Sequence, residues 1–182
     1  MSQSYVYNLI MESPKYPLSV GTERDLLEQH LEFCRQTVIY KVTGISKENG
    51  IKRLGSTSTS VLGVLRHLTE VEYGWFHINF AGLEYTEGRY SEANPDGDFE
   101  IYEGDTVDSL LDEYKKACEI SRQHCAGKSL DDLATKPRPR DNMQPSLRWI
   151  YLHMIDETAR HAGHLDIYRE LIDGAHDGNI PN

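Results

Sequence analysis

The sequence predicts an all-α protein, a four-helix bundle in which long helices are joined by long crossover connections. Apolar residues recur at helical spacing in four long segments. Gly and Pro, which interrupt helices, fall between these segments. A chain of 182 residues is long enough for one domain with a good core and short for two. We therefore expect a single domain over residues 1–182, with its core at about 22–174.

The first two predicted helices cover residues 22–42 and 59–81. Thr22 is suited to cap the first helix, and Asp25 stands three residues later, at the capping-box position. The second segment is apolar nearly all round, which is typical of a helix at the centre of a bundle. Gly82 then provides a natural end, because glycine favours the conformation found just past helix C-termini.

The third and fourth predicted helices cover residues 106–126 and 146–173. Asp105 is expected to cap the third helix, and Gly127 to end it. Gly174 ends the fourth helix in the same way. The third helix thus has a typical N-cap residue, and both helices are followed by the glycine that commonly ends a helix.

Two long links connect the later helices. Residues 83–104 are acidic and rich in Gly, Tyr and Asp, whereas residues 128–145 contain Pro and are basic through Lys136, Arg138 and Arg140. Links of this length permit crossovers, lids over a site, or short strands and turns. Steering of an anionic substrate is one interpretation of the basic residues, and a solvated linker is the default.

Charge and cysteine content exclude several classes of function. A net charge of −10 disfavours binding to nucleic acid or to anionic lipid. No apolar run approaches the roughly 20 residues that cross a bilayer, and residues 1–17 lack the pattern of a secretion signal. Cys34, Cys118 and Cys125 are odd in number and have no CxxC spacing, which suits a reducing compartment. We expect a cytoplasmic protein that acts on neither nucleic acid nor membranes.

A stripe of titratable residues is the strongest functional signal in the chain. His153, Glu157, His161 and His164 follow one another at spacings of four, four and three on the last predicted helix. These spacings place the four side chains on one narrow face, and its apolar borders indicate that this face points inward. Burial of so many titratable groups is unfavourable unless they pair or bind a metal.

A metal site would need a further ligand from another helix, and His67 is the best candidate. One helix supplies two ligands at i, i+4 spacing, but these do not close a coordination sphere. His67 lies midway along the second predicted helix, with Gly63 and Gly74 on its face leaving room for a neighbour. A core histidine bonded to a backbone carbonyl is the ordinary interpretation of a lone His. The His/Glu stripe, which lacks one ligand, favours the metal instead.

Two short strings then carry a resemblance to a known family. The string ETARHAGHLD from Glu157, with LRHL from Leu65, resembles the DinB/YfiT-like metal-dependent superfamily. Within it, the pattern looks like the branch that contains the maleylpyruvate isomerase N-terminal domain and the mycothiol S-transferases. The resemblance spans residues 22–174. It implies an up-down-down-up four-helix bundle with a divalent metal, zinc first and nickel or iron as alternatives, between the second and fourth helices.

The resemblance also assigns the metal ligands. Carried over to this chain, they are His67, Glu157 and His161. Many relatives have His in place of Glu157, and the Glu form matches the mycothiol branch. Many relatives have Gln in place of His164, which we interpret as a neighbour of the ligands, a substrate-facing group or a fourth ligand.

This ligand set implies a chemistry. Two neutral imidazoles and one carboxylate leave a divalent ion with net positive charge and open positions. Such an ion lowers the pKa of a bound thiol or water. The resemblance therefore implies a transferase in which a low-molecular-weight thiol, such as mycothiol, attacks a small electrophile. Arg160 is a candidate helper that binds a carboxylate of either partner, with a structural salt bridge as the alternative, and His164 is a second candidate helper.

Two other functions remain open at this stage. The same ion could activate water, which would make the protein a hydrolase. Alternatively, the bundle could bind a metal or small ligand without turnover, as a stress-response protein would. A site closed by His164 as fourth ligand would favour a structural ion. The chain is expected to be a monomer or a homodimer.

For the remaining polar and aromatic residues near these faces, ordinary structural roles are the first expectation. Glu70 could orient a ligand imidazole, although a solvated or Arg-paired carboxylate is the ordinary expectation. Trp75 is expected in the core and His153 as a structural histidine. His77 and His124 show no partner pattern in the sequence.

Overall fold

The computed structural model describes residues 13–54, 59–138 and 140–174. Most of the segment inspected for a secretion signal, residues 1–12, lies outside these ranges. The elements are α2 (Glu23–Val42), α3 (Lys47–Gly50), α4 (Val61–Glu72), η1 (Tyr73–Phe80), η2 (Gly97–Phe99), α5 (Val107–Cys125) and α6 (Leu147–Asp173). The described ranges contain isolated bridges but no β-strand. The predicted all-α class is confirmed.

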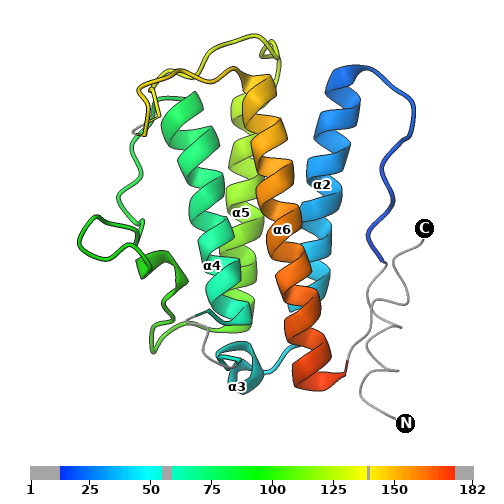
Figure 1. Ribbon diagram of the computed structural model, residues 1–182, viewed down its shortest axis with the longest axis vertical. Helices are drawn as coiled ribbons and strands as arrows, with labels where there is room; N and C mark the ends of the chain where they lie inside the picture. The colour runs from blue at the N-terminus through cyan, green and yellow to red at the C-terminus, as the bar shows by residue number, and fades with distance from the viewer. Residues whose placement is uncertain (1–12, 55–58, 139, 175–182) are drawn as a thin grey trace.

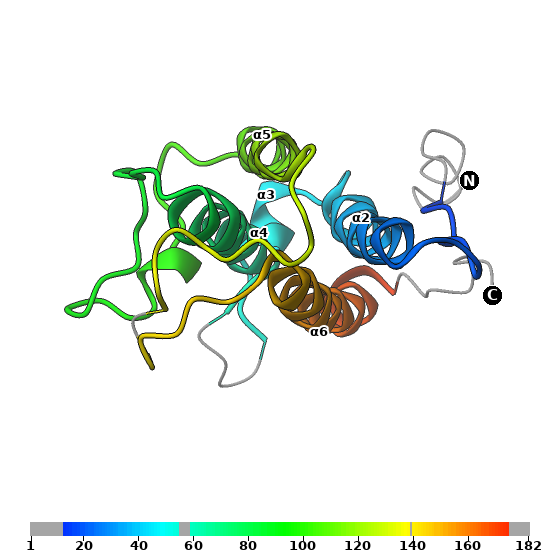
Figure 2. The ribbon, with the colours of Figure 1, turned by 90° about the horizontal axis from the view of Figure 1, so that it is seen from above.

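The long helical segments α2, α4 with η1, α5 and α6 lie side by side in the structure (Figure 1). Seen from above, α4 and α2 occupy opposite corners, and α5 and α6 lie between them (Figure 2). Helix α2 packs mainly on α6, and α4 mainly on α5. Within the described part of the chain, no helix is long and apolar enough to cross a membrane.

Two apolar clusters fill the space between the helices. One includes Val38, Leu65 and Leu165, and the other includes Leu31 and Met154. All five of these side chains are fully buried. Burial of large aliphatic side chains stabilises a fold by about 1.5–3 kcal/mol each, so these clusters supply the force that holds α4 and α6 together.

Polar caps begin the long helices, mostly as the sequence indicates. Thr22 caps α2 in a reciprocal capping box with Asp25, as predicted. The prediction that Asp105 caps α5 is wrong, because the Thr106 side chain accepts the backbone N–H of Ser109 instead. The Asp105 carboxylate accepts the backbone N–H of Tyr102 and is engaged away from the helix end.

The second predicted helix changes its winding halfway. It is α-helical over Val61–Glu72 and π-helical over Tyr73–Phe80. A π-helix uses i→i+5 hydrogen bonds, so side chains beyond Glu72 no longer follow the α-helical phase from which the sequence prediction placed Gly74 beside His67. The helical segment ends near Gly82, which has the positive φ of 76° that glycine accommodates best.

A buried ion pair lies at this change of winding. Arg35 on α2 donates two hydrogen bonds of 2.7 Å to the carboxylate of Glu72, and the Ser121 hydroxyl on α5 donates a third of 2.7 Å. Glu72 is only 1% exposed. Although burial opposes its charge, the Glu72 carboxylate raises the pKa of Arg35. Three helices are thus joined at one point in the core.

Replacing Glu72 with Ala is expected to destabilise the protein strongly. The change leaves the Arg35 guanidinium buried without its carboxylate, which typically costs about 3–5 kcal/mol. The free energy of unfolding in urea measures the effect. Glu119→Ala is a matched control, because it removes an exposed ion pair with Arg122 and should leave the unfolding midpoint unchanged. Equal midpoints for both variants would contradict the structural role of Glu72.

Candidate metal centre

The structure brings His67, Glu157 and His161 together, and we call these residues the three-residue cluster. His67 comes from α4, and the other two come from successive turns of α6. The Nε2 atoms of His67 and His161 lie 3.2 Å and 3.1 Å from the same Glu157 oxygen, Oε1. The potential ligand atoms of the cluster all lie within 4.8 Å of one another. These are the three residues that the sequence analysis selected as metal ligands.

The charges of the cluster stabilise one another. Hydrogen bonds from His161 and His67 hold the pKa of Glu157 well below its usual range. Burial opposes protonation of His67, but hydrogen bonds to Asp98 and Glu157 outweigh burial and raise its pKa to about 9. The cluster without a metal is therefore an ion pair, with a proton on each nitrogen that faces a carboxylate.

The donor set fits a divalent metal ion. Two imidazole nitrogens and one carboxylate oxygen are the ligands of many catalytic zinc sites. Arg160 donates a hydrogen bond of 3.1 Å to Oε2 of Glu157, so Oε1 alone faces the two imidazoles. A cation placed among these atoms would replace the protons that now lie between them.

Asp98 is a residue of the site that sequence reasoning missed. It belongs to η2, in the long link after η1, and its Oδ2 lies 2.6 Å from Nδ1 of His67. The ring of the next residue, Phe99, stacks on the His67 imidazole with centroids 4.3 Å apart. The sequence offered no signal for this contact beyond the acidity of the link, because the two residues are 31 positions apart.

Residues on one face of α4 contact this link. The residues at positions i, i+3, i+4 and i+7 of this face are Gly63, Arg66, His67 and Glu70. A Cβ at Gly63 would lie 2.6 Å from the backbone oxygen of Phe99, so only glycine lets the link approach this closely. The room that the glycine provides is therefore filled by the link.

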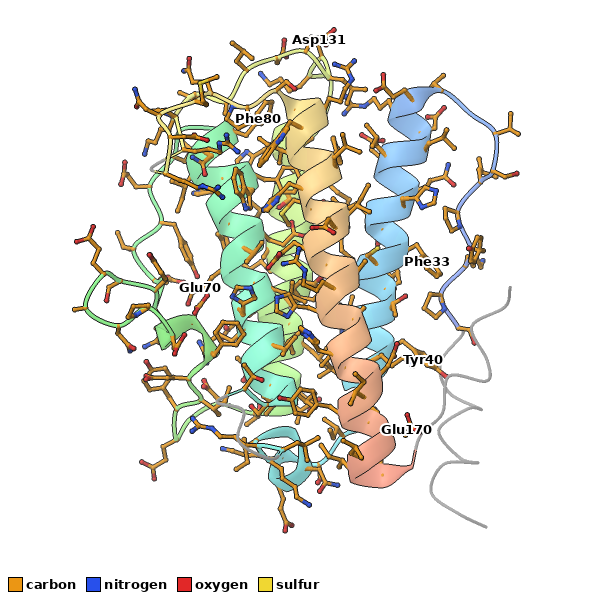
Figure 3. The ribbon with its side chains drawn as sticks, in the orientation of Figure 1. Phe33, Tyr40, Glu70, Phe80, Asp131 and Glu170 are labelled. Carbon is orange, nitrogen blue, oxygen red and sulfur yellow. The ribbon has the colours of Figure 1, made fainter. Side chains whose placement is uncertain are left out.

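Glu70 and Arg66 hold the link on either side of η2. The Glu70 carboxylate accepts backbone N–H groups of Arg89 and Tyr90 at 2.8–3.2 Å, and Figure 3 shows Glu70 on the side of α4 where the link runs. Arg66 pairs with Asp105. Glu70 thus orients the link, whereas Asp98 contacts the imidazole.

His164 and Arg160 border the cluster without belonging to the group of converging ligand atoms. The exposed His164 ring meets that of His161 edge-on at 5.3 Å. Burial and electrostatic repulsion from neighbouring basic groups, among them Arg160, lower the pKa of His164. Arg160 is 55% exposed and bonds to both Glu157 and Asp156, so it forms the salt bridge that the sequence analysis offered as an alternative.

His153 lies one turn before Glu157 in an aromatic cluster. Its ring stacks on Trp149 at 5.1 Å and meets Trp75 edge-on at 4.5 Å. The Arg138 guanidinium lies 4.5 Å from the Trp149 ring and pairs with Asp141. Burial lowers the pKa of His153. Arg138 therefore closes an aromatic cluster against α6.

His77 and His124, which showed no pattern in the sequence, are partners in the structure. Nδ1 of His77 on η1 lies 2.9 Å from Nε2 of His124 on α5. His124 also lines a cavity of about 620 Å³ together with Phe80, Gln123 and Thr135. No member of the three-residue cluster lines this cavity, so the two features are separate.

The fold and the cluster define a class of protein, an all-α bundle with a His–His–Glu group that could hold a metal ion. Comparison with protein families then gives a specific result. The model of the mycothiol S-transferase family matches residues 26–174. The chain therefore belongs to the mycothiol S-transferase family, in the branch that the sequence motifs indicated. The comparisons with curated proteins and with solved structures gave no match.

The pKa of His67 gives a prediction for the metal-free protein. His67 should remain protonated at neutral pH and titrate near pH 9, whereas His153 should titrate below 6.5. Because the pKa of His67 is raised on folding, its ion pair stabilises the fold fully below about pH 6.5 and less as pH rises through about 9. Histidine NMR shifts and unfolding temperatures between roughly pH 6 and 10 measure both effects.

The His67→Gln variant is the control for this titration. It keeps a polar side chain but has no proton to lose, so the decline in stability across this range should become smaller. A His67 signal that titrates near 6.5 in the wild-type protein would contradict the ion pair described above.

Proposed function

We propose that this protein is a divalent-metal-dependent transferase that joins a low-molecular-weight thiol, mycothiol or a close analogue, to a small electrophile. The observation that carries the proposal is the convergence of His67, Glu157 and His161 on one point, in a chain of the mycothiol S-transferase family. The proposal covers the metal dependence, the zinc ion that we expect and the electrophile as substrate.

His67, Glu157 and His161 are the proposed ligands. A divalent ion held by two neutral imidazoles and one carboxylate keeps positive charge and lowers the pKa of a thiol that binds to it. The protein's contribution is to fix the three donors before the ion arrives. Arg160 restrains the outer oxygen of Glu157, and Asp98 restrains the outer nitrogen of His67.

The proposed reaction moves one proton and forms one bond to sulfur. The thiol loses its proton, its sulfur attacks the electrophilic carbon, and the leaving group departs with the electron pair of the broken bond. His164 is exposed beside His161, and its lowered pKa keeps its imidazole neutral near pH 7. We therefore assign to His164 the role of accepting the thiol proton and passing it to solvent.

The metal site is tested first by metal content. His67→Ala and His161→Ala should each lower the bound metal well beyond twofold, because each variant lacks a direct ligand. His30→Ala is the matched control, because His30 lies exposed on α2 and should leave metal content unchanged. Elemental analysis of the purified proteins decides the question. A ligand variant with full stoichiometric metal would refute the assignment.

The reaction is tested next, with the zinc-loaded protein and a model electrophile. Mycothiol, glutathione or cysteine is added, and the products are followed by mass spectrometry. We expect a thiol conjugate with mycothiol and a rate close to the uncatalysed one for His161→Ala. Turnover without any thiol would favour a hydrolase. A protein that keeps its metal but forms no product with any of these thiols would favour a non-catalytic ion.

A further inference from the structure

We infer that Asp98 is a positioning residue, which fixes the protonation pattern of the His67 ring so that Nε2 presents its lone pair to a metal ion. This inference rests on the proposed function, because it concerns the same ligand cluster. It goes further, because it assigns part of the metal affinity of the site to the long link after η1. This link supplies none of the three converging ligand atoms.

The chemistry of the contact determines which ring nitrogen carries the proton. A neutral imidazole has one N–H donor and one lone pair, and a carboxylate can only accept. Because Oδ2 of Asp98 lies 2.6 Å from Nδ1 of His67, Nδ1 must carry the proton. In the metal-free cluster Nε2 also carries a proton, which it donates toward Glu157. When a metal ion displaces one proton from the ring, the contact with Asp98 keeps the proton on Nδ1, so Nε2 is the nitrogen that presents its lone pair. Metal-binding histidines commonly donate their other N–H in this way.

Asp98 has no second hydrogen-bonding role within the described ranges. It is 6% exposed, and its Oδ1 is buried without a hydrogen-bond partner there. A carboxylate in this position is costly unless its one partner donates a proton. Asp98 therefore selects strongly for a proton on Nδ1. The Nδ1 atom of the other imidazole, that of His161, is buried and has no hydrogen-bond partner among the described residues.

The backbone around Asp98 is held in place from two directions. On one side, the backbone oxygen of Phe99 fits against Gly63. On the other, a Cβ at Gly97 would lie only 2.3 Å from the backbone oxygen of Arg89, so glycine is needed there too. The backbone N–H of Arg89 is in turn bound by Glu70. Asp98 is thus placed by the packing of two glycines.

The inference is tested by zinc affinity, measured in competition with a chelator, for the full-length protein and three variants. Asp98→Ala removes the acceptor and should weaken binding by about 10–100-fold, the usual effect of losing such a partner. Asp98→Asn keeps an oxygen acceptor without the charge and should lose less. Glu103→Gln is the control, because it neutralises an exposed carboxylate of the same link without touching Asp98 or the anchors of the link, and it should bind zinc as the wild type does.

A second readout reports the ring itself. In the zinc-loaded wild type, nitrogen NMR should show a proton on Nδ1 of His67, and this signal should be lost or exchange-broadened in Asp98→Ala. The inference is overturned if Asp98→Ala binds zinc as tightly as the wild type, or if Glu103→Gln loses as much affinity as Asp98→Ala. Wild-type protein that binds no zinc would instead overturn the proposed metal centre, and this inference with it.

Discussion

The fold is organised around one carboxylate oxygen, Oε1 of Glu157, which lies between the Nε2 atoms of His67 and His161. Titratable groups in a half-buried position are tolerated only when they satisfy one another or bind a cation. This constraint fixes the position along the bundle axis at which His67 on α4 meets Glu157 on α6. The apolar clusters of Leu65 and Leu165 on one side and Met154 on the other bring the helices close enough to meet it.

A second constraint acts on the outer face of α4. In a simple bundle that face would be solvated, but here the long link after η1 covers it (Figures 1 and 2). The contacts are polar through Glu70 and Asp98 and apolar through Phe99, which stacks on His67 and packs against the core. A length of chain that resembles an ordinary connection thereby contributes to the electrostatics of the candidate site.

The buried pair of Arg35 and Glu72 holds the same helix from its inner face. It lies where α4 gives way to the π-helix η1. Helix α4 is therefore fixed by an ion pair toward the core and by the link toward the outside, with His67 between these restraints. Membership of the mycothiol S-transferase family and this rigid placement of donors together motivate the proposed thiol chemistry, which requires ligands that are already in position.

Local patterns in the sequence determined the helices, their ends and the stripe on α6. Helical periodicity and capping depend on residues within a few positions of one another, which explains why Thr22, Gly174 and the spacing of Glu157 and His161 were predictable. For His67, its place midway along the second predicted helix made it the best candidate for the missing ligand, and the family resemblance then assigned it as one.

Tertiary structure alone decided the rest. The His67–Asp98 contact and the His77–His124 pair join residues 31 and 47 positions apart, and no periodic pattern links positions so distant. The Arg66–Asp105 ion pair likewise joins residues that are 39 positions apart. Such contacts form only when packing brings separate elements together, because their free energy depends on burial and geometry rather than on neighbouring residues.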